Sequence, residues 1–174
     1  MFNSFRFYLL LVFCFNMLLY SCNPGDKAEI EKSAAAFDMA QGKASILQGN
    51  QSFMKAFKAG DSTGVANNYT IDGKIMPANS PAIVGRDNIK HFISSIMSGG
   101  IKDFQLVSVN IWGDSSILAE EGSYKIADSL GNQVDQGKYI VLWKEESGNW
   151  KMFRDIWTSD ILEPALVQKE AKSL

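Results

Sequence analysis

The stretch GKYIVLWKEESGNWKMFRDIW, residues 137–157, carries the pattern that decides the fold class. In its first half Tyr139, Val141 and Trp143 recur at every second position, so they are expected on one side of an extended strand. The ESGN segment that follows has the composition of a tight turn, and apolar residues resume at Trp150. The stretch therefore predicts an antiparallel β-hairpin rich in aromatic side chains.

Two more strand patterns precede this hairpin, at residues 103–112 and 117–126. In the first of them, alternation places Val107, Val109 and Ile111 on one face and Phe104, Leu106 and Trp112 on the other. A short GDSS segment separates the two patterns and is typical of a turn. The second half of the chain is therefore expected to form a four-stranded meander.

The residues before these strands have helical spacing, apart from a short predicted strand region at residues 71–78 that is ended by Pro77 and Pro81. Apolar residues that recur every three, four and seven positions predict helices over residues 26–59 and 85–98, with a short helix at 61–69 between them. Gly42 and Gly49 can divide the first helix, because glycine is a poor helix former. Helices followed by an antiparallel meander indicate an α+β domain.

The N-terminus has the organisation of an export signal. Arg6 is followed by an apolar run over residues 7–20, which is too short to span a bilayer, and then by Ser21 and Cys22. The segment LLYSC at the end of this run resembles the lipobox of bacterial lipoproteins, in which the cysteine becomes the lipidated first residue of the mature protein. We therefore expect Cys22 to be lipidated and the protein to be exported and anchored in the bacterial cell envelope.

The predicted organisation has four parts: a cleaved signal peptide at 1–21, a lipidated tether and helix start at 22–32, an α+β domain at 33–162, and a C-terminal tail at 163–174. Asn23 follows the lipidated position, which favours the outer membrane by resemblance to the sorting of enteric lipoproteins. The domain would then face the periplasm. The membrane, reached through the lipid on Cys22, is one expected partner.

Composition excludes several classes of function. Without residues 1–21 the chain keeps 17 − 1 = 16 basic and 19 acidic residues, and because the basic ones are scattered no nucleic-acid partner is expected. Cys14 lies in the signal and Cys22 carries the lipid, so no thiol remains for a disulfide or a zinc site. His91 is the only histidine and lies opposite the apolar stripe of its helix. We expect neither a metal nor a cofactor.

Three segments in order resemble the nuclear transport factor 2-like superfamily: FKAGD at 57–61 followed by Tyr69, PAIVGRDNI at 81–89, and the hairpin at 137–157. Within that superfamily the sequence is similar to the SnoaL-like, ketosteroid isomerase-like group of small domains, over roughly residues 46–160. The resemblance implies a cone-shaped, strongly curved antiparallel sheet closed by N-terminal helices. It also implies an apolar pocket and a homodimer formed through the sheet.

The chemistry of the ketosteroid isomerases does not carry over to this chain. Their carboxylate base precedes the proline of the first strand region, and Met76 stands there in this sequence. The best match to their phenolic donor is Phe53. Neither side chain can accept a proton or donate a hydrogen bond to an oxyanion.

Asp155 is the first of three candidates for other chemistry. Alternation places it on the strand face of Phe153 and Trp157, so that it becomes a carboxylate in aromatic surroundings. In a pocket, desolvation would raise its pKa toward a useful range. The alternative is that Asp155 forms a structural ion pair with Arg86 or Lys138.

Glu120 and Tyr124 are the other two candidates. Alternation places both on one otherwise apolar face of residues 117–126, together with Leu118 and Ile126. If this face lines the pocket, Glu120 could serve in acid–base catalysis. The alternative is a structural pairing of Glu120 with a neighbouring lysine.

The expected ligand pocket is apolar and aromatic. Its predicted lining is Phe53, Phe57, Tyr69, Met76, Phe92, Trp143, Phe153 and Trp157. Ordinary core or dimer-interface roles remain open for Trp143, Trp157 and Tyr139. The leading interpretation is a lipid-anchored domain that binds a small hydrophobic molecule in a binding or accessory role. The alternatives are a pocket enzyme of isomerase, cyclase or hydrolase type that uses Asp155 and Glu120, and a partner-docking or dimerisation module.

Overall fold

The computed structural model describes residues 37–161, and from Asp38 onward they belong to one compact unit. Its elements in chain order are α3 (Met39–Ala59), α4 (Ser62–Ala66), β1 (Tyr69–Met76), β2 (Ile83–Val84), α5 (Arg86–Ser98), β3 (Ile101–Gly113), β4 (Leu118–Asp128), β5 (Gln133–Glu146) and β6 (Asn149–Ser159). Cys22, the predicted signal and tether, and the tail at 163–174 lie outside the described residues. None of the helices described is long and apolar enough to cross a membrane.

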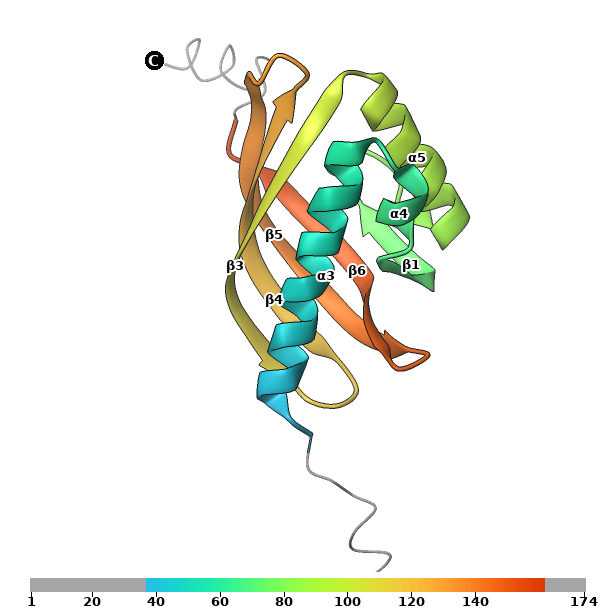
Figure 1. Cartoon of the computed structure of the whole chain (residues 1–174), viewed down its shortest axis with the longest axis vertical. Helices are drawn as coiled ribbons and strands as arrows, with labels where there is room; N and C mark the ends of the chain where they lie inside the picture. The colour runs from blue at the N-terminus through green and yellow to red at the C-terminus, as the bar shows by residue number, and fades with distance from the viewer. Residues whose placement is uncertain (1–36, 162–174) are drawn as a thin grey trace, which may run out of the picture. The chain divides into compact units, whose positions relative to one another are not determined.

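The strands form one curved, unclosed sheet in the order β2-β1-β6-β5-β4-β3 (Figure 1). The predicted α+β fold, a curved sheet with the helices in the N-terminal half, is confirmed. All neighbours are antiparallel except β1 and β6, which run parallel, so the sheet extends beyond the predicted four-stranded meander. Figure 1 shows α3 lying along one face of the sheet and α4 and α5 grouped beside β1. The face covered by these helices is called the inner face below.

Helix α3 starts later than the sequence predicts. Asp38 has an extended backbone (φ −84°, ψ 98°), and its Oδ1 accepts hydrogen bonds from the N–H groups of Ala40 and Gln41, which makes it the N-cap. The predicted helix over residues 26–59 is therefore interrupted at Asp38, and its part before residue 37 lies outside the described residues. Gly49 does not break α3 either: a Cβ there would lie 2.9 Å from the Trp143 ring, so glycine lets the helix approach the sheet.

A β-bulge in β3 corrects the predicted face of that strand. Ser108 pairs with Gly122 and Asn110 with Glu121, so Val109 is an extra residue. One extra residue reverses the alternation that follows it. Consequently Val107 and Val109 are exposed, whereas Ile111, predicted on the same face, is buried.

A second bulge, in β6, places Phe153 on the opposite face of the strand from Asp155 and Trp157. Leu142 pairs with Arg154 and Trp143 with Met152, which leaves Phe153 as the extra residue. Met152 is buried, while the Phe153 ring packs under the guanidinium of Arg154, 3.5 Å from ring centroid to Cζ. The predicted shared face of Phe153 and Asp155 is therefore wrong, because a strict period of two does not hold across a bulge.

One row of residues across the sheet positions both predicted carboxylates. The registers place Ile111, Glu120, Val141, Asp155 and Ile75 side by side on β3, β4, β5, β6 and β1. The other four side chains of this row are buried, and Asp155 is half-buried. Both carboxylates therefore point to the inner face, with one valine between them.

Candidate functional site

A small cavity of about 60 Å³ lies between the inner face of the sheet and helices α3 and α5. Its lining is largely apolar and includes seven aromatic residues. The lining residues are Phe53, Tyr69, Ile75, Phe92, Ile93, Ile96, Phe104, Tyr124, Tyr139, Asp155 and Trp157. This volume suits a small group rather than a drug-sized molecule.

Asp155 is the one formally charged residue among the cavity-lining residues. The hydroxyl of Tyr69 on β1 donates to its Oδ2 at 2.7 Å, and the residues described supply no donor to its Oδ1. Burial disfavours the charged carboxylate and raises the pKa of Asp155 to about 6; the negative charge of Glu120 adds to this rise, and the Tyr69 hydrogen bond opposes it. The same burial, with the adjacent Asp155 charge, raises the pKa of Tyr69 well above its ordinary value, so its hydroxyl stays a donor.

Glu120 lies fully buried beside this cavity and is held by neutral donors. Its Oε1 accepts from Asn50 Nδ2 at 2.6 Å, from the Tyr139 hydroxyl at 2.8 Å and from the Ser108 hydroxyl, and its Oε2 accepts from Trp143 Nε1 at 2.9 Å. The predicted lysine partner is therefore wrong. Four hydrogen bonds satisfy the buried carboxylate without a cation, as the desolvation of a buried charge requires.

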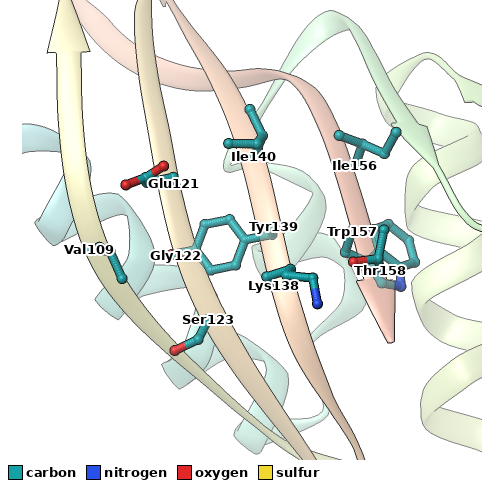
Figure 2. Close-up of a pocket in the computed structure, with 10 residues that line it drawn as sticks. All are labelled: Val109, Glu121, Gly122, Ser123, Lys138, Tyr139, Ile140, Ile156, Trp157 and Thr158. Atoms are coloured by element: carbon teal, nitrogen blue, oxygen red, sulfur yellow. The ribbon is translucent and has the colours of Figure 1, made fainter. Parts of the chain in front are cut away.

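Tyr139 connects Glu120 to the cavity. Gly122 lies directly opposite it on β4, and a Cβ at Gly122 would come within 2.4 Å of the Tyr139 ring and hydroxyl. Figure 2 shows the ring of Tyr139 lying toward Gly122 of the neighbouring strand. Burial and the negative charge of Glu120 raise the pKa of Tyr139, so its hydroxyl remains a donor to that carboxylate.

Tyr124 lines the cavity, and its hydroxyl is bound near the beginning of β5. The hydroxyl donates to Asp135 Oδ2 at 2.9 Å. Burial raises the pKa of Tyr124, and the hydrogen bond and charge of Asp135 raise it further. Tyr124 is therefore a neutral wall residue whose donor is already occupied.

The structure brings together some of the predicted pocket residues and not others. Phe53, Tyr69, Phe92 and Trp157 line the cavity, with Asp155 and Tyr124. Phe57, Met76, Trp143 and Phe153 are not among the lining residues. Phe57 packs behind Phe53 and Phe104, Trp143 lies under Gly49, and Phe153 is on the far side of the bulge.

The predicted ion pairs of Asp155 are wrong. Arg86 instead pairs with Glu146 and donates to the carbonyl oxygen of Tyr69, which fixes the start of α5 against β1. Lys138 pairs with Asp160 at the end of β6. Asp155 is thus free of basic partners within the described structure, which leaves it available to the cavity.

Other lining residues did not appear in the predicted pocket. Ile93 and Ile96 belong to the apolar stripe of the predicted helix at 85–98, and this stripe is the sequence signal that could have predicted them as lining residues. For Phe104 the sequence predicts a strand face but no role in the pocket, and the structure places it in the lining. Asn50 and Ser108 carry no sequence pattern that marks them as partners of Glu120, since they are brought together only by packing.

A second hollow, called the outer trough, lies on the opposite face of the sheet and has a volume of about 490 Å³ (Figure 2). Its floor is the backbone of one cross-strand row, Gly122, Tyr139 and Trp157, in which the side chains of Tyr139 and Trp157 point inward. The rows on either side of the floor form its rims, namely Glu121, Ile140 and Ile156 on one and Ser123, Lys138 and Thr158 on the other. The trough is open and more exposed than the inner cavity.

No group of three or more His, Cys, Asp or Glu side chains that could hold a metal ion occurs within residues 37–161. The histidine His91 is exposed on α5, as its position opposite the apolar stripe predicts. The chemistry available at the cavity is therefore that of a carboxylate with a neighbouring phenol.

Solved proteins with very different sequences share this fold. A domain of unknown function with a cystatin-like fold from Nostoc punctiforme matches with a TM-score of 0.65 at 13% identity, over 79% of this chain and 88% of that one. A nuclear transport factor 2-like protein with a cystatin-like fold from Novosphingobium aromaticivorans matches at 0.64 and 10%, over 86% and 97%. A ketosteroid isomerase-like protein from Erwinia carotovora atroseptica matches at 0.58 and 18%, over 68% and 96%.

The chain therefore has the nuclear transport factor 2-like cone fold. The sequence matches no protein-family model and no curated protein. At identities below one fifth, the likeness establishes the fold, and this fold serves many unrelated functions. The function must be argued from the residues of the site.

We predict that the carboxyl of Asp155 titrates near pH 6 in the folded protein, compared with an ordinary value of 3.8. Tyr69→Phe removes the hydrogen bond that stabilises the charged form, so the pKa of Asp155 should rise further. Carboxyl ¹³C NMR during a pH titration measures both. Tyr124→Phe is the matched control, because its hydroxyl serves Asp135 and its loss should leave Asp155 unchanged.

The raised pKa also sets the sign of a stability change. The folded Asp155 holds its proton more tightly than the unfolded chain, so it favours folding below about pH 4, and this contribution is lost as the pH rises through about 6. A titration midpoint of the Asp155 carboxyl near pH 4, or a midpoint that Tyr69→Phe does not shift, would contradict this account of the site.

Proposed function

We propose that this chain is a lipid-anchored pocket domain whose inner cavity binds a small molecule, largely apolar, with one polar group directed at Asp155. The observation that carries the proposal is the position of Asp155 in an aromatic cavity, with Oδ2 bound to Tyr69 and Oδ1 open to a ligand. Ligand sites are typically apolar with a few placed polar groups that fix orientation. The role is a binding or accessory one.

The size of the cavity sets the size of the ligand. A volume of about 60 Å³ is far below the roughly 300 Å³ at which drug-sized ligand pockets begin. A steroid-sized molecule does not fit this arrangement. The ligand that fits is a small molecule with few non-hydrogen atoms, or the small head of a longer molecule.

Titration of the full-length chain with ethanol, followed by NMR of the Ile93 methyl and Trp157 indole groups, tests this proposal. Saturable shifts at both reporters are expected. Ile96→Phe fills the cavity from α5 and should raise the dissociation constant by at least about tenfold, since a well-packed space cannot accept both groups. The matched control is Ile161→Phe, because Ile161 is half-exposed and is not among the lining residues. Saturable shifts that persist unchanged in Ile96→Phe would refute binding in the cavity.

A pocket enzyme is the second candidate, and the raised pKa of Asp155 favours it. A carboxyl with a pKa of about 6 exchanges its proton close to neutral pH, as a general acid or base requires. Glu120 does not share this role, because all its hydrogen bonds serve the protein interior and it is fully buried. Turnover of a bound compound that disappears in Asp155→Asn while binding persists would separate the enzyme from the binding domain.

The proposed location rests on Cys22 and on its resemblance to a lipobox cysteine. Two lipid groups on one mature N-terminal cysteine hold a protein stably on a membrane. Asn23 favours the outer membrane, with the domain in the periplasm. Mass spectrometry should find a mature chain that starts at lipidated Cys22. Cys22→Ser should leave the precursor uncleaved and without lipid; a soluble wild-type chain that retains residues 1–21 would contradict the anchor.

The outer trough is proposed as the contact surface of a homodimer. Val109, Ile140 and Ile156 are exposed there, although they are apolar. Glu121 and Lys138 carry opposite charges across the trough, so a two-fold axis can pair them reciprocally. Sedimentation equilibrium should show a dimer that Ile140→Glu dissociates, whereas Ile71→Glu, an equally drastic change at exposed β1, should not. A monomeric wild-type protein would refute this surface.

A further inference from the structure

The lining of the inner cavity has an unusual chemical balance. Seven of its eleven residues are aromatic, Asp155 is an acid, and no lysine, arginine or histidine takes part. Among the described residues, the Oδ1 of Asp155 has no hydrogen-bond donor, whereas Oδ2 has Tyr69. The cavity therefore offers a ligand one carboxylate oxygen and the π-systems of the rings around it.

A second carboxylate adds to the negative charge near the cavity. Glu120 lies in the same cross-strand row as Asp155, separated from it by Val141 alone. Two strand spacings separate their backbones, about 10 Å. The donors of Glu120 are all neutral, so no basic side chain cancels its charge. The effect of this charge on Asp155 is already visible in the raised pKa of Asp155.

We propose that the ligand of the inner cavity is a small organic ammonium ion, bound by the carboxylate of Asp155 and by the surrounding aromatic rings. The inference rests on the proposed function, since it names the chemical class that the same cavity takes. Ammonium groups bind both to carboxylates and to the negative faces of aromatic rings, and such aromatic cages recognise alkylated ammonium groups.

The two other charge classes fit this cavity less well. An anion would meet two carboxylates, and the hydroxyls of Tyr69, Tyr124 and Tyr139 already donate to carboxylates of the protein, so that of the lining side chains only the indole N–H of Trp157 could donate to it. A neutral ligand would leave the charge of Asp155 without a partner in a low-dielectric space. A cation compensates this charge and gains from the rings as well.

The charge requirement makes binding depend on pH. Asp155 must be ionised to pair with an ammonium ion, and it becomes protonated as the pH falls through about 6. The other titratable groups that face it are Tyr69 from β1, Tyr124 and Glu120 from β4, and Tyr139 from β5, while α3, α5 and β3 contribute only phenylalanine and isoleucine. The tyrosines stay neutral because the pKa of each is raised. Affinity for the ammonium ion should therefore fall between pH 7.5 and pH 5.

Three probes of equal size separate the classes: ethylammonium, ethanol and formate, each with three non-hydrogen atoms. Each is titrated into the full-length chain at pH 7.5, with the Ile93 methyl and Trp157 indole signals as reporters. Ethylammonium should bind about tenfold more tightly than ethanol, which is the size of one charge-assisted and cation–π contact, and formate should not bind. In Asp155→Asn the ratio of ethylammonium to ethanol affinity should fall toward one. Lowering the pH to 5 should weaken ethylammonium binding to the wild-type chain severalfold.

The outcomes distinguish this inference from the function on which it rests. Ethanol binding as tightly as ethylammonium, or formate binding best, overturns the ammonium assignment and leaves the pocket function standing. Absence of saturable binding by all three probes overturns both. Should Asp155→Asn not fold, the pH comparison on the wild-type chain decides: affinity for ethylammonium that is unchanged between pH 7.5 and pH 5 refutes the role of Asp155.

Discussion

The carboxylate of Glu120 is the point where four elements of the domain meet. It sits on β4 and receives Asn50 from α3, Ser108 from β3, and Tyr139 and Trp143 from β5. A buried carboxylate is stable only when its hydrogen bonds are made, and leaving such a charge without a partner costs several kcal/mol. The helix, the curved sheet and the wall of the cavity are therefore tied to one another through a polar group, and the cavity beside it keeps a defined shape.

Small departures from regular structure make this arrangement possible. Gly49 lets α3 approach Trp143, and Gly122 leaves room for the ring of Tyr139. The bulges at Val109 and Phe153 change which residues face inward, and the bulge at Phe153 places Asp155 on the inner face. Bulges bend and twist a strand, so the same features that select the inner residues also contribute to the curvature of the sheet.

The site shows why a shared fold leaves the function open. The positions that the isomerase resemblance assigns to a base and a phenol hold Met76 and Phe53, yet the cavity contains a carboxylate with a phenol bound to it, Asp155 and Tyr69. These come from β6 and β1, which are neighbours in the sheet although they are 86 residues apart in sequence. The fold provides a cavity, and in this chain the polar groups of the cavity are Asp155 and Tyr69, at positions other than those of the isomerases.

The sequence by itself determined the α+β class, the shared face of Tyr139, Val141 and Trp143, and the exposure of His91, because these depend on local periodicity. Only the tertiary structure decided which strands carry bulges and which residues complete the cavity. The parallel pairing of β1 with β6 and the convergence of Asn50, Ser108 and Trp143 on Glu120 were likewise beyond the sequence pattern. A bulge is one extra residue that the composition of the strand does not predict. A long-range hydrogen bond between common polar residues is likewise not predicted by the spacing of residues in the sequence. Both exist only once the chain has packed.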